Sequence, residues 1–299
     1  MSKNILMELS DALADAAEKA GKATVTVNAR RRMPASGIAY AADLILTADH
    51  VIEREEDITV TLADGTEVPA RLAGRDAGSD LAVLRLERAA ATPAEVTDAP
   101  ARLGQLALVL GRPSGDGIEA SLGTVGAIGG PVRTARGGML ERYIRTDSIS
   151  YPGFSGGPLV AADGTVLGLN TSGLGRGGAI TIPADIAWKI AETLTKHGRI
   201  KRGYLGIRSQ TVEIPGASQK ALGRDQETGL LVVSVENDSP ASRGGLIVGD
   251  ILVAVAGQPV LHHDELFTRL GGDVAGTSTP VEVLRGGQPQ TLNIVIGER

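Results

Sequence analysis

The N-terminal segment carries apolar side chains at helical spacing. These positions are Ile5, Leu9, Leu13, Ala16 and Ala20. Spacings of three and four residues are typical of an amphipathic helix, so we expect residues 1–22 to form an N-terminal helix that can end at Gly21. We expect this helix to pack across the body of the protein, and a contact between subunits is the alternative.

From Ala23 onward the period changes to two. Val25 and Val27 alternate with threonines, which is typical of a strand. The dipeptides Asp64-Gly65 and Asp163-Gly164 are typical of hairpin turns. Further short apolar runs are bounded by glycine, proline or charge, at residues 58–62, 68–72, 81–86, 106–110, 122–128 and 159–170. About a dozen strands with almost no helix predict an antiparallel barrel or sandwich.

A second pattern begins after a predicted linker helix at residues 184–197. Its apolar positions lie four apart, and a charged stretch at residues 199–202 follows it. Such a stretch predicts an exposed connection, so we place the domain boundary near residue 200 and assign residues 23–200 and 203–299 to two domains. The second domain reads as a small α+β module, with strands expected at 230–235, 251–255, 281–284 and 291–296 and a helix at 263–270.

Composition and charge exclude several classes of function. The net charge of −5 and the pI near 5.5 give no electrostatic footprint for a nucleic-acid partner. The basic run Arg30–Arg32 is expected to be the solvated end of a strand. The sequence has no cysteine, so disulfides and a thiol nucleophile are excluded.

Localisation is open at this point. No segment approaches the roughly 18 to 20 apolar residues of a membrane span, and residues 1–22 lack a continuous apolar stretch of the signal-peptide type. As written, the sequence predicts a cytoplasmic protein. An exported or periplasmic protein whose leader has been removed is the alternative.

A glycine-rich turn, GFSGGP at residues 153–158, carries the candidate nucleophile Ser155. The glycines allow the main-chain N–H groups of Gly153 and Ser155 to converge on one point, as an oxyanion site requires. Glycine–serine turns without chemistry are also common. The assignment therefore needs a base nearby.

His50 and Asp80 are the candidates for that base and for the carboxylate that orients it. Of the four histidines, His197 lies in the predicted linker helix and two lie in the second domain, which leaves His50 in the barrel region. Asp80 directly precedes an apolar strand, where a carboxylate can fix one imidazole tautomer. Asp76 competes, but its flanks indicate a turn. A Ser-His-Asp triad for acyl transfer is predicted.

These segments resemble the HtrA (Deg) proteases. The resemblance covers residues 23–297 and keeps the family's His, Asp, Ser order. The protease-like segments are TADHV (47–51), GRD…SDLAVL (74–84), LG…LGRP (103–113), TD…PGFSGGP (146–158) and LGLNT (167–171). The segments that look like the following PDZ domain are YLGI (204–207), SPA…GL…GD (239–250) and GQP (257–259).

The resemblance implies a mainly β protein, with a chymotrypsin-like double β-barrel protease domain followed by a small α+β PDZ domain. It implies an ATP-independent serine endopeptidase that cleaves unfolded or misfolded polypeptides, assembled as a homotrimer or higher oligomer. Ser155 would attack, His50 would move the proton, Asp80 would orient it, and the N–H groups of Gly153 and Ser155 would hold the oxyanion. We expect no cofactor and no metal.

The resemblance also implies where a substrate side chain binds. Ile149 lies six residues before the nucleophile and offers no charge to a basic side chain, so we expect a preference for small aliphatic residues. The residues expected to line this pocket are Ile149, Leu167, Gly168, Leu169 and Asn170. The loop at residues 173–182 is expected to shape the same pocket.

In the PDZ-like domain, main-chain N–H groups are expected to hold the C-terminal carboxylate of a peptide. The residues expected at this groove are Tyr204, Leu205, Gly206, Ile207, Leu266 and Leu270. For Leu266 and Leu270, packing in the hydrophobic core is the alternative. A domain that activates the barrels allosterically is a further hypothesis. The pair His262–His263 has no third ligand nearby in sequence, so it predicts no metal site.

Two residues depart from the family pattern. Phe154 and Tyr151 stand where HtrA proteins usually carry asparagine. Bulky side chains there can change how the oxyanion loop is held or how the pocket is shaped. A chaperone or peptide-binding protein on a protease fold, with little turnover, is therefore the alternative function.

Overall fold

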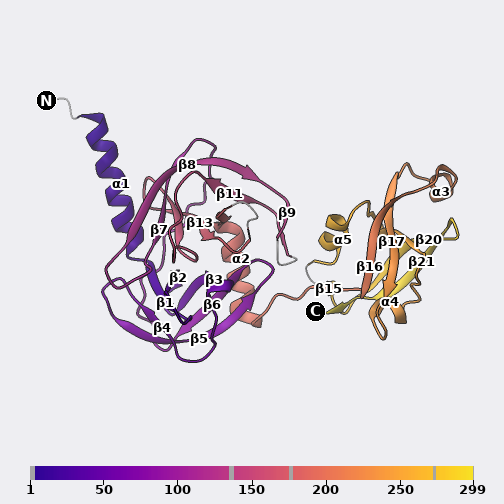
Figure 1. Ribbon diagram of the computed structural model, residues 1–299, viewed down its shortest axis with the longest axis horizontal. Coiled ribbons are helices and arrows are strands. Elements are labelled where there is room, and N and C mark those ends of the chain that lie inside the picture. Colours follow the sequence, from indigo (N-terminus) through magenta and orange to yellow (C-terminus); the bar gives the residue numbers. More distant parts are fainter. Residues whose placement is uncertain (1–3, 135–137, 175–177, 272–273, 299) are drawn as a thin grey trace. The chain divides into compact units, whose positions relative to one another are not determined.

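Figure 1 shows the computed structural model, which describes residues 4–134, 138–174, 178–271 and 274–298. The chain divides into two compact units, Met1–Ile200 and Lys201–Arg299. Each unit has its own hydrophobic core, and each is described by itself. Among the described residues, no helix combines the length and the apolar character needed to cross a bilayer.

The first barrel of unit 1 is a closed antiparallel sheet in the order β1-β2-β3-β6-β5-β4. Its strands are β1 (Thr24–Asn28), β2 (Ala35–Ala41), β3 (Leu44–Ala48), β4 (Ile58–Thr61), β5 (Glu67–Asp76) and β6 (Leu81–Leu86). The first Asp-Gly dipeptide lies in the turn that joins β4 to β5, where Gly65 has a φ of 86°. Glycine adopts this left-handed conformation at little cost because it has no Cβ.

The second barrel is also closed, in the order β11-β14-β13-β12-β7-β8. Its strands are β7 (Leu106–Gly111), β8 (Glu119–Gly129), β11 (Tyr143–Thr146), β12 (Pro158–Ala161), β13 (Val166–Thr171) and β14 (Ile180–Pro183). A short ribbon of β9 (Val132–Arg133) and β10 (Met139–Leu140) extends from it. The predicted double β-barrel is confirmed.

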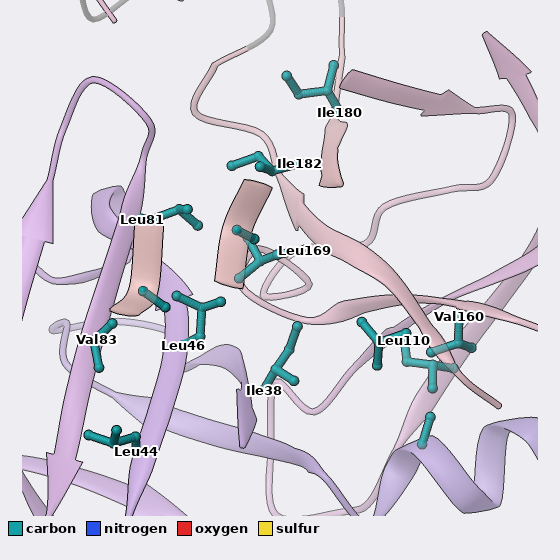
Figure 2. Close-up of a cluster of buried hydrophobic side chains, with 14 of the residues drawn as sticks. Ile38, Leu44, Leu46, Leu81, Val83, Leu110, Val160, Leu169, Ile180 and Ile182 are labelled. Carbon is teal, nitrogen blue, oxygen red and sulfur yellow. The ribbon is translucent and has the colours of Figure 1, made fainter. Parts of the chain in front are cut away.

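A hydrophobic cluster joins the two barrels. Leu44 and Leu46 of β3 belong to this cluster, whereas Ile45 between them belongs to the core of the first barrel. A strand buried on both faces reads as a continuous apolar run, as β3 and β6 do. Figure 2 shows residues of both barrels in the cluster, including Leu81 of β6 and Leu169 of β13. Because such packing is dense, the ends of these strands are held in fixed positions.

Two helices pack on the barrels. The helix α2 (Ala184–His197) contacts strands of both barrels and ends at Gly198, whose φ is 75°. The helix α1 (Ile5–Gly21) buries Ala16 and Ala20 near its C-terminal end, while Ile5 is 77% exposed. The expected packing across the body therefore holds for the second half of α1, and its first half extends past the barrels (Figure 1).

Unit 2 is built on one antiparallel sheet in the order β16-β17-β18-β20-β21, with β19 beside β18. The strands of this sheet are β16 (Ile207–Glu213), β17 (Thr228–Val235), β18 (Ile251–Val255), β19 (Gln258–Pro259), β20 (Ser278–Arg285) and β21 (Gln288–Val295). A separate two-stranded sheet pairs β15 (Gly203–Tyr204) with β22 (Gly297–Glu298). The helices of unit 2 are α3 (Gly216–Leu222), α4 (Pro240–Arg243) and α5 (His263–Arg269). The predicted α+β character of this domain is confirmed, although α3 was not predicted.

Candidate active site

The pairing of β3 with β6 brings His50 and Asp80 together. Ala48 at the end of β3 lies opposite Leu81 at the start of β6. His50 follows β3 in a 3-10 turn, η1 (Asp49–Val51), and Asp80 directly precedes β6 with a φ of 54°. The His50 Nδ1 atom lies 2.8 Å from Asp80 Oδ2, and the His50 main-chain N–H donates to Asp80 Oδ1 at 2.9 Å. The carboxylate is fully buried, so it can fix the orientation of the imidazole.

Asp76, the competing carboxylate, has a structural role. It accepts hydrogen bonds from the Ser79 main-chain N–H at 2.8 Å and from Ser79 Oγ at 2.6 Å. These bonds close the turn between β5 and β6 in the way that aspartate side chains commonly do. The turn in turn places Asp80 at the start of β6.

Thr171 is a further contact of the Asp80 carboxylate that sequence analysis did not single out. Its hydroxyl, at the end of β13, donates to Asp80 Oδ2, and it accepts the Gly173 main-chain N–H at 2.9 Å. Together with the contact to His50, this bond restrains the Asp80 carboxylate. This bond also ties the first barrel to the second beside the site.

Arg75 holds the turn that carries His50. Its Nε donates to Asp49 Oδ1 at 2.6 Å, and its Nη2 donates to the main-chain oxygen of Ile52 at 3.3 Å. The hydrogen bond to Asp49 is the largest cause that raises the pKa of Arg75 above its ordinary value. Since Asp49 is buried and directly precedes His50, this ion pair restrains the turn that carries His50.

Ser155 lies in the turn before β12, and its neighbours show why the turn is rich in glycine. A Cβ at Gly156 would lie 2.1 Å from the main-chain oxygen of Ser36, and one at Gly157 would lie 2.2 Å from that of Leu110. Gly156 also has a φ of 90°. Side chains at either position would therefore push Ser155 out of place.

The hydroxyl of Ser155 is bonded to Ser172. The two Oγ atoms lie 3.0 Å apart, and the Ser172 main-chain N–H reaches Ser155 Oγ at 3.3 Å. No hydrogen bond joins Ser155 to His50 within the described part of the chain. Both residues nevertheless line one cavity of about 810 Å³, which also contains Ser172.

The main-chain N–H groups of Gly153 and Ser155 make no hydrogen bond with the described residues. Gly153 has a φ of 88°, and its carbonyl oxygen accepts from Ser36 Oγ at 2.7 Å. The Phe154 N–H, in the same peptide group as this carbonyl, donates to the Tyr151 carbonyl at 3.1 Å, so both ends of this peptide group are restrained. Free N–H groups at this position suit a developing oxyanion.

Ser36 is a second residue that sequence analysis missed. Its hydroxyl donates to Gly153 and accepts the Arg112 main-chain N–H at 2.8 Å, while its own N–H donates to the Ser155 carbonyl at 3.2 Å. Ser36 lies in β2 of the first barrel, and its partners lie in the second. The nucleophile turn is therefore fastened to the barrel that carries His50.

Phe154, the residue before the nucleophile, is fully buried in the core of the second barrel. Tyr151 lies edge-on to its ring, with the ring centroids 5.4 Å apart. A Cβ at Gly111 would approach Phe154 Cδ1 to 2.4 Å, so the ring fills the space that Gly111 leaves open. The turn is thus anchored by an aromatic side chain.

A second cavity, of about 290 Å³, adjoins the first and shares Ser150 and Ser172 with it. The other residues that line it are Val109, Arg145, Thr146, Ser148, Asn170, Gly178, Ala179, Ile180 and Thr181. All of these residues come from the second barrel and its loops. Residues 178–181 belong to the loop expected to shape the pocket, and residues 175–177 of that loop lie outside the described residues.

The predicted pocket needs correction at four of its five positions. Asn170 lines the second cavity, but Leu167 and Leu169 are buried in hydrophobic clusters. Gly168 lies against the main chain of β14, where a Cβ would come within 2.2 Å of an oxygen. Ile149 is 60% exposed and lines neither cavity. Both faces of β13 are buried, so apolar residues there belong to cores and not to a pocket.

In unit 2, Leu205 and Gly206 form the segment between β15 and β16. Their main-chain N–H groups make no hydrogen bond with the described residues. Gly206 has a φ of 79°, and its carbonyl accepts the Glu236 N–H at 2.8 Å, while Ile207 begins β16. The Tyr204 hydroxyl donates to the Glu236 carboxylate. This segment has the free donors that a carboxylate site requires.

Leu266 and Leu270, which were expected at the groove, are core residues. Leu266 of α5 and Leu270 just after it are buried in the hydrophobic core of unit 2, which Leu205 also joins. Their side chains pack mainly inward, which was the alternative considered for them. At the start of α5, His263 Nε2 lies 3.0 Å from the main-chain oxygen of Ser209.

Comparisons with known proteins agree with this architecture. A family model described as a trypsin-like peptidase domain matches residues 35–169, and a PDZ domain model matches residues 203–296. The chain is 34% identical over 269 residues to a protein of Pseudomonas savastanoi named as a probable periplasmic serine endoprotease, DegP-like. It is 33% identical over 275 residues to a protein of the same name from Halomonas elongata. These matches cover 88% and 90% of this chain but 55% and 57% of the relatives.

Solved structures extend the likeness to nearly the whole chain. The HtrA-type protease AlgW with a decapeptide has a TM-score of 0.80 and 28% identity, with 96% of this chain and 98% of that chain covered. A serine endoprotease from Yersinia pestis has a TM-score of 0.78 and 30% identity, with the same coverage. With its two barrels, its PDZ domain and these relatives, the chain belongs to the HtrA (Deg) family of serine proteases.

Proposed function

We propose that this chain is an ATP-independent serine endopeptidase that cleaves unfolded or misfolded polypeptides. The observation that carries the proposal is the 2.8 Å contact between His50 Nδ1 and a buried Asp80, with Ser155 on the same cavity. A buried carboxylate on Nδ1 leaves Nε2 as the acceptor for a serine proton. The names of the related proteases support the same activity.

The reaction begins with a change of rotamer. Ser155 Oγ leaves Ser172 and turns to His50 Nε2, which takes the hydroxyl proton as the oxygen attacks the scissile carbonyl. The main-chain N–H groups of Gly153 and Ser155 stabilise the oxyanion. His50 then gives the proton to the leaving amine, and an acyl-enzyme on Ser155 remains. Water then attacks the ester as His50 takes its proton, the acyl C–O bond to Ser155 breaks, and His50 returns the proton to Ser155 Oγ as the acid departs.

Covalent labelling with a fluorophosphonate tests this proposal, because the reagent reacts with activated serines. We expect labelling of the wild type, no labelling of Ser155→Ala, and casein digestion that the same substitution abolishes. A wild type that neither labels nor digests casein would contradict the proposal. It would favour the alternative of a peptide-binding protein on a protease fold.

We also propose that unit 2 binds peptide C-termini. The free N–H groups of Leu205 and Gly206 support this role, since a terminal carboxylate needs convergent donors and the peptide can add as a strand beside β16. Fluorescence polarisation with a peptide and its C-terminal amide is the test. We expect binding of the free acid and loss of binding of the amide; equal binding of both contradicts the carboxylate site. Deleting residues 203–299 and measuring peptide cleavage tests whether this unit also regulates the barrels.

An oligomer and an exported location are further proposals. The first half of α1 exposes apolar side chains that a subunit contact would cover, namely Ile5, Leu6, Met7 and Leu9. Light scattering coupled to size-exclusion chromatography checks this, and a monomer at micromolar concentration contradicts it. The relatives are named as periplasmic, which supports the exported alternative. Fractionation of cells that express the full gene product tests it.

A further inference from the structure

The basic run Arg30–Arg32 borders the proposed active site. It follows β1 in the loop that leads to β2, and all three arginines line the 810 Å³ cavity together with His50 and Ser155. The run was expected to be a solvated strand end. The side chains of Arg31 and Arg32 are indeed exposed, but they are exposed at the mouth of the catalytic cavity.

Arg30 has a local role that differs from that of its neighbours. Its Nε donates to the Met33 carbonyl, and its Nη2 donates to the Pro34 carbonyl at 3.0 Å. Both acceptors lie in the same loop. Arg30 therefore braces the loop from within, and its two neighbours are left to face the cavity.

The charges around the cavity are unbalanced. Glu53 is the single carboxylate among the residues that line it, and its Oε2 accepts the Arg31 main-chain N–H at 3.5 Å. The guanidinium groups of Arg31 and Arg32 form no ion pair with any residue that the structure describes. A protein with a net charge of −5 thus presents a positive edge at this cavity. Such an edge attracts acidic groups of a bound partner.

The position of Arg31 and Arg32 indicates which side of the scissile bond they contact in a bound substrate. Arg31, Arg32, Glu53 and His50 all come from the first barrel, and His50 must face the leaving amine to protonate it. The 290 Å³ cavity is lined by the second barrel and its loops alone, so it is available to the acyl side of the substrate. The arginines therefore face the part of the polypeptide that departs first.

We propose that Arg31 and Arg32 select substrates with aspartate or glutamate in the few residues after the scissile bond. This inference rests on the proposed peptidase function and adds a substrate class to it. Two exposed cation–carboxylate pairs are each worth a modest factor, so we expect about a threefold to tenfold preference in kcat/KM.

Matched internally quenched peptides test the preference. One peptide carries Asp in the second position after the scissile bond, and its partner carries Asn there. The variants are Arg31→Gln/Arg32→Gln and a control, Arg88→Gln/Arg102→Gln, which removes the same charge at exposed positions that line neither cavity. We expect the Asp/Asn ratio of kcat/KM to fall to near one in the first variant and to stay at the wild-type value in the control.

The dependence of the Asp/Asn preference on salt concentration and on the position of Asp in the peptide provides two more readouts. The preference should shrink at about 1 M salt, where the Debye length is about 3 Å. A wild-type ratio near one, a ratio that survives the loss of both arginines, or an equal preference for Asp on the acyl side overturns the inference. Those results leave fluorophosphonate labelling of Ser155 intact, so they are distinct from failure of the peptidase proposal. Loss of both labelling and cleavage in the wild type overturns both.

Discussion

The Ser155 hydroxyl oxygen lies 3.0 Å from the Ser172 hydroxyl oxygen and also accepts the Ser172 main-chain N–H at 3.3 Å. Ser155 is thus held by Ser172, the residue that follows β13, and not by His50. In the proposed mechanism, Ser155 must give up these contacts before His50 can take its proton. The proposal therefore predicts that these contacts slow the attack.

We predict that Ser172→Ala raises the rate of fluorophosphonate labelling. A neutral hydrogen bond contributes about 0.5–1.5 kcal/mol, so removing it should speed labelling about twofold to tenfold. Ser150→Ala is the matched control, because Ser150 lines the same two cavities and, among the described residues, makes no hydrogen bond to Ser155. Slower labelling of Ser172→Ala, with the control unchanged, would show that Ser172 assists the nucleophile instead.

Thr171 is expected to raise turnover because its hydroxyl donates a hydrogen bond to the Asp80 carboxylate. Thr171→Val keeps the shape of a buried side chain but removes the donor to Asp80. Hydrogen bonds to charged groups are worth about 1.5–3 kcal/mol, so we expect kcat to fall roughly 10-fold to 100-fold. For comparison, the Asp→Asn change in this class of triad costs about 10⁴-fold.

Thr171→Ser provides the control for that prediction, since it retains a hydroxyl at the same position. We expect it to keep most of the activity. A Thr171→Val variant with wild-type kcat would mean that the His50 and main-chain contacts suffice to orient Asp80. Melting temperatures of both variants separate a fold defect from a catalytic one.

The residues of the proposed triad could be predicted from the sequence for a physical reason. His50 and Asp80 stand at the ends of apolar strands, and Ser155 stands among glycines, so each residue has a recognisable local sequence context. The pairing of β3 with β6 explains why His50 and Asp80 meet, and the close main-chain contacts explain the glycines. Ser36 and Thr171 have no such local context. A hydroxyl residue within a strand looks ordinary until tertiary structure places an acceptor beside it.

The substrate pocket shows the opposite error. Leu167 and Leu169 were predicted to line the pocket because they are apolar and near the site, yet both are core residues. The polar residues that line the second cavity, such as Ser148 and Thr146, were not among the residues predicted for the pocket. Periodicity predicts that a strand is buried, but it does not distinguish a face that packs on protein from a face left for substrate.

Ser36 should link stability to activity. Ser36→Ala leaves the Gly153 carbonyl and the Arg112 main-chain N–H without their hydroxyl partner. Unpaired buried groups cost about 1–3 kcal/mol, so we expect a lower free energy of unfolding and a lower kcat together. Urea unfolding and peptide cleavage measure the two effects. Ser114→Ala, at a half-buried serine whose hydroxyl donates to Asp116 in a solvent-exposed hydrogen bond, is the control. If Ser36→Ala loses stability but keeps full kcat, the bond to Gly153 does not position the nucleophile turn.

Phe154 and Gly111 should be coupled in stability, because the ring occupies the space where a Cβ at Gly111 would lie. Phe154→Ala removes a fully buried ring, so we expect a loss of about 3–5 kcal/mol in the free energy of unfolding. Gly111→Ala alone should also destabilise the fold, since the new methyl group would lie 2.4 Å from Phe154 Cδ1. In the double variant the methyl group no longer meets the ring, so the combined loss should be smaller than the sum of the single losses by about 0.5–3 kcal/mol. Urea unfolding of the four proteins measures this coupling. Additive losses would mean that the ring does not restrict position 111, and the anchoring of the nucleophile turn by Phe154 would then need another explanation.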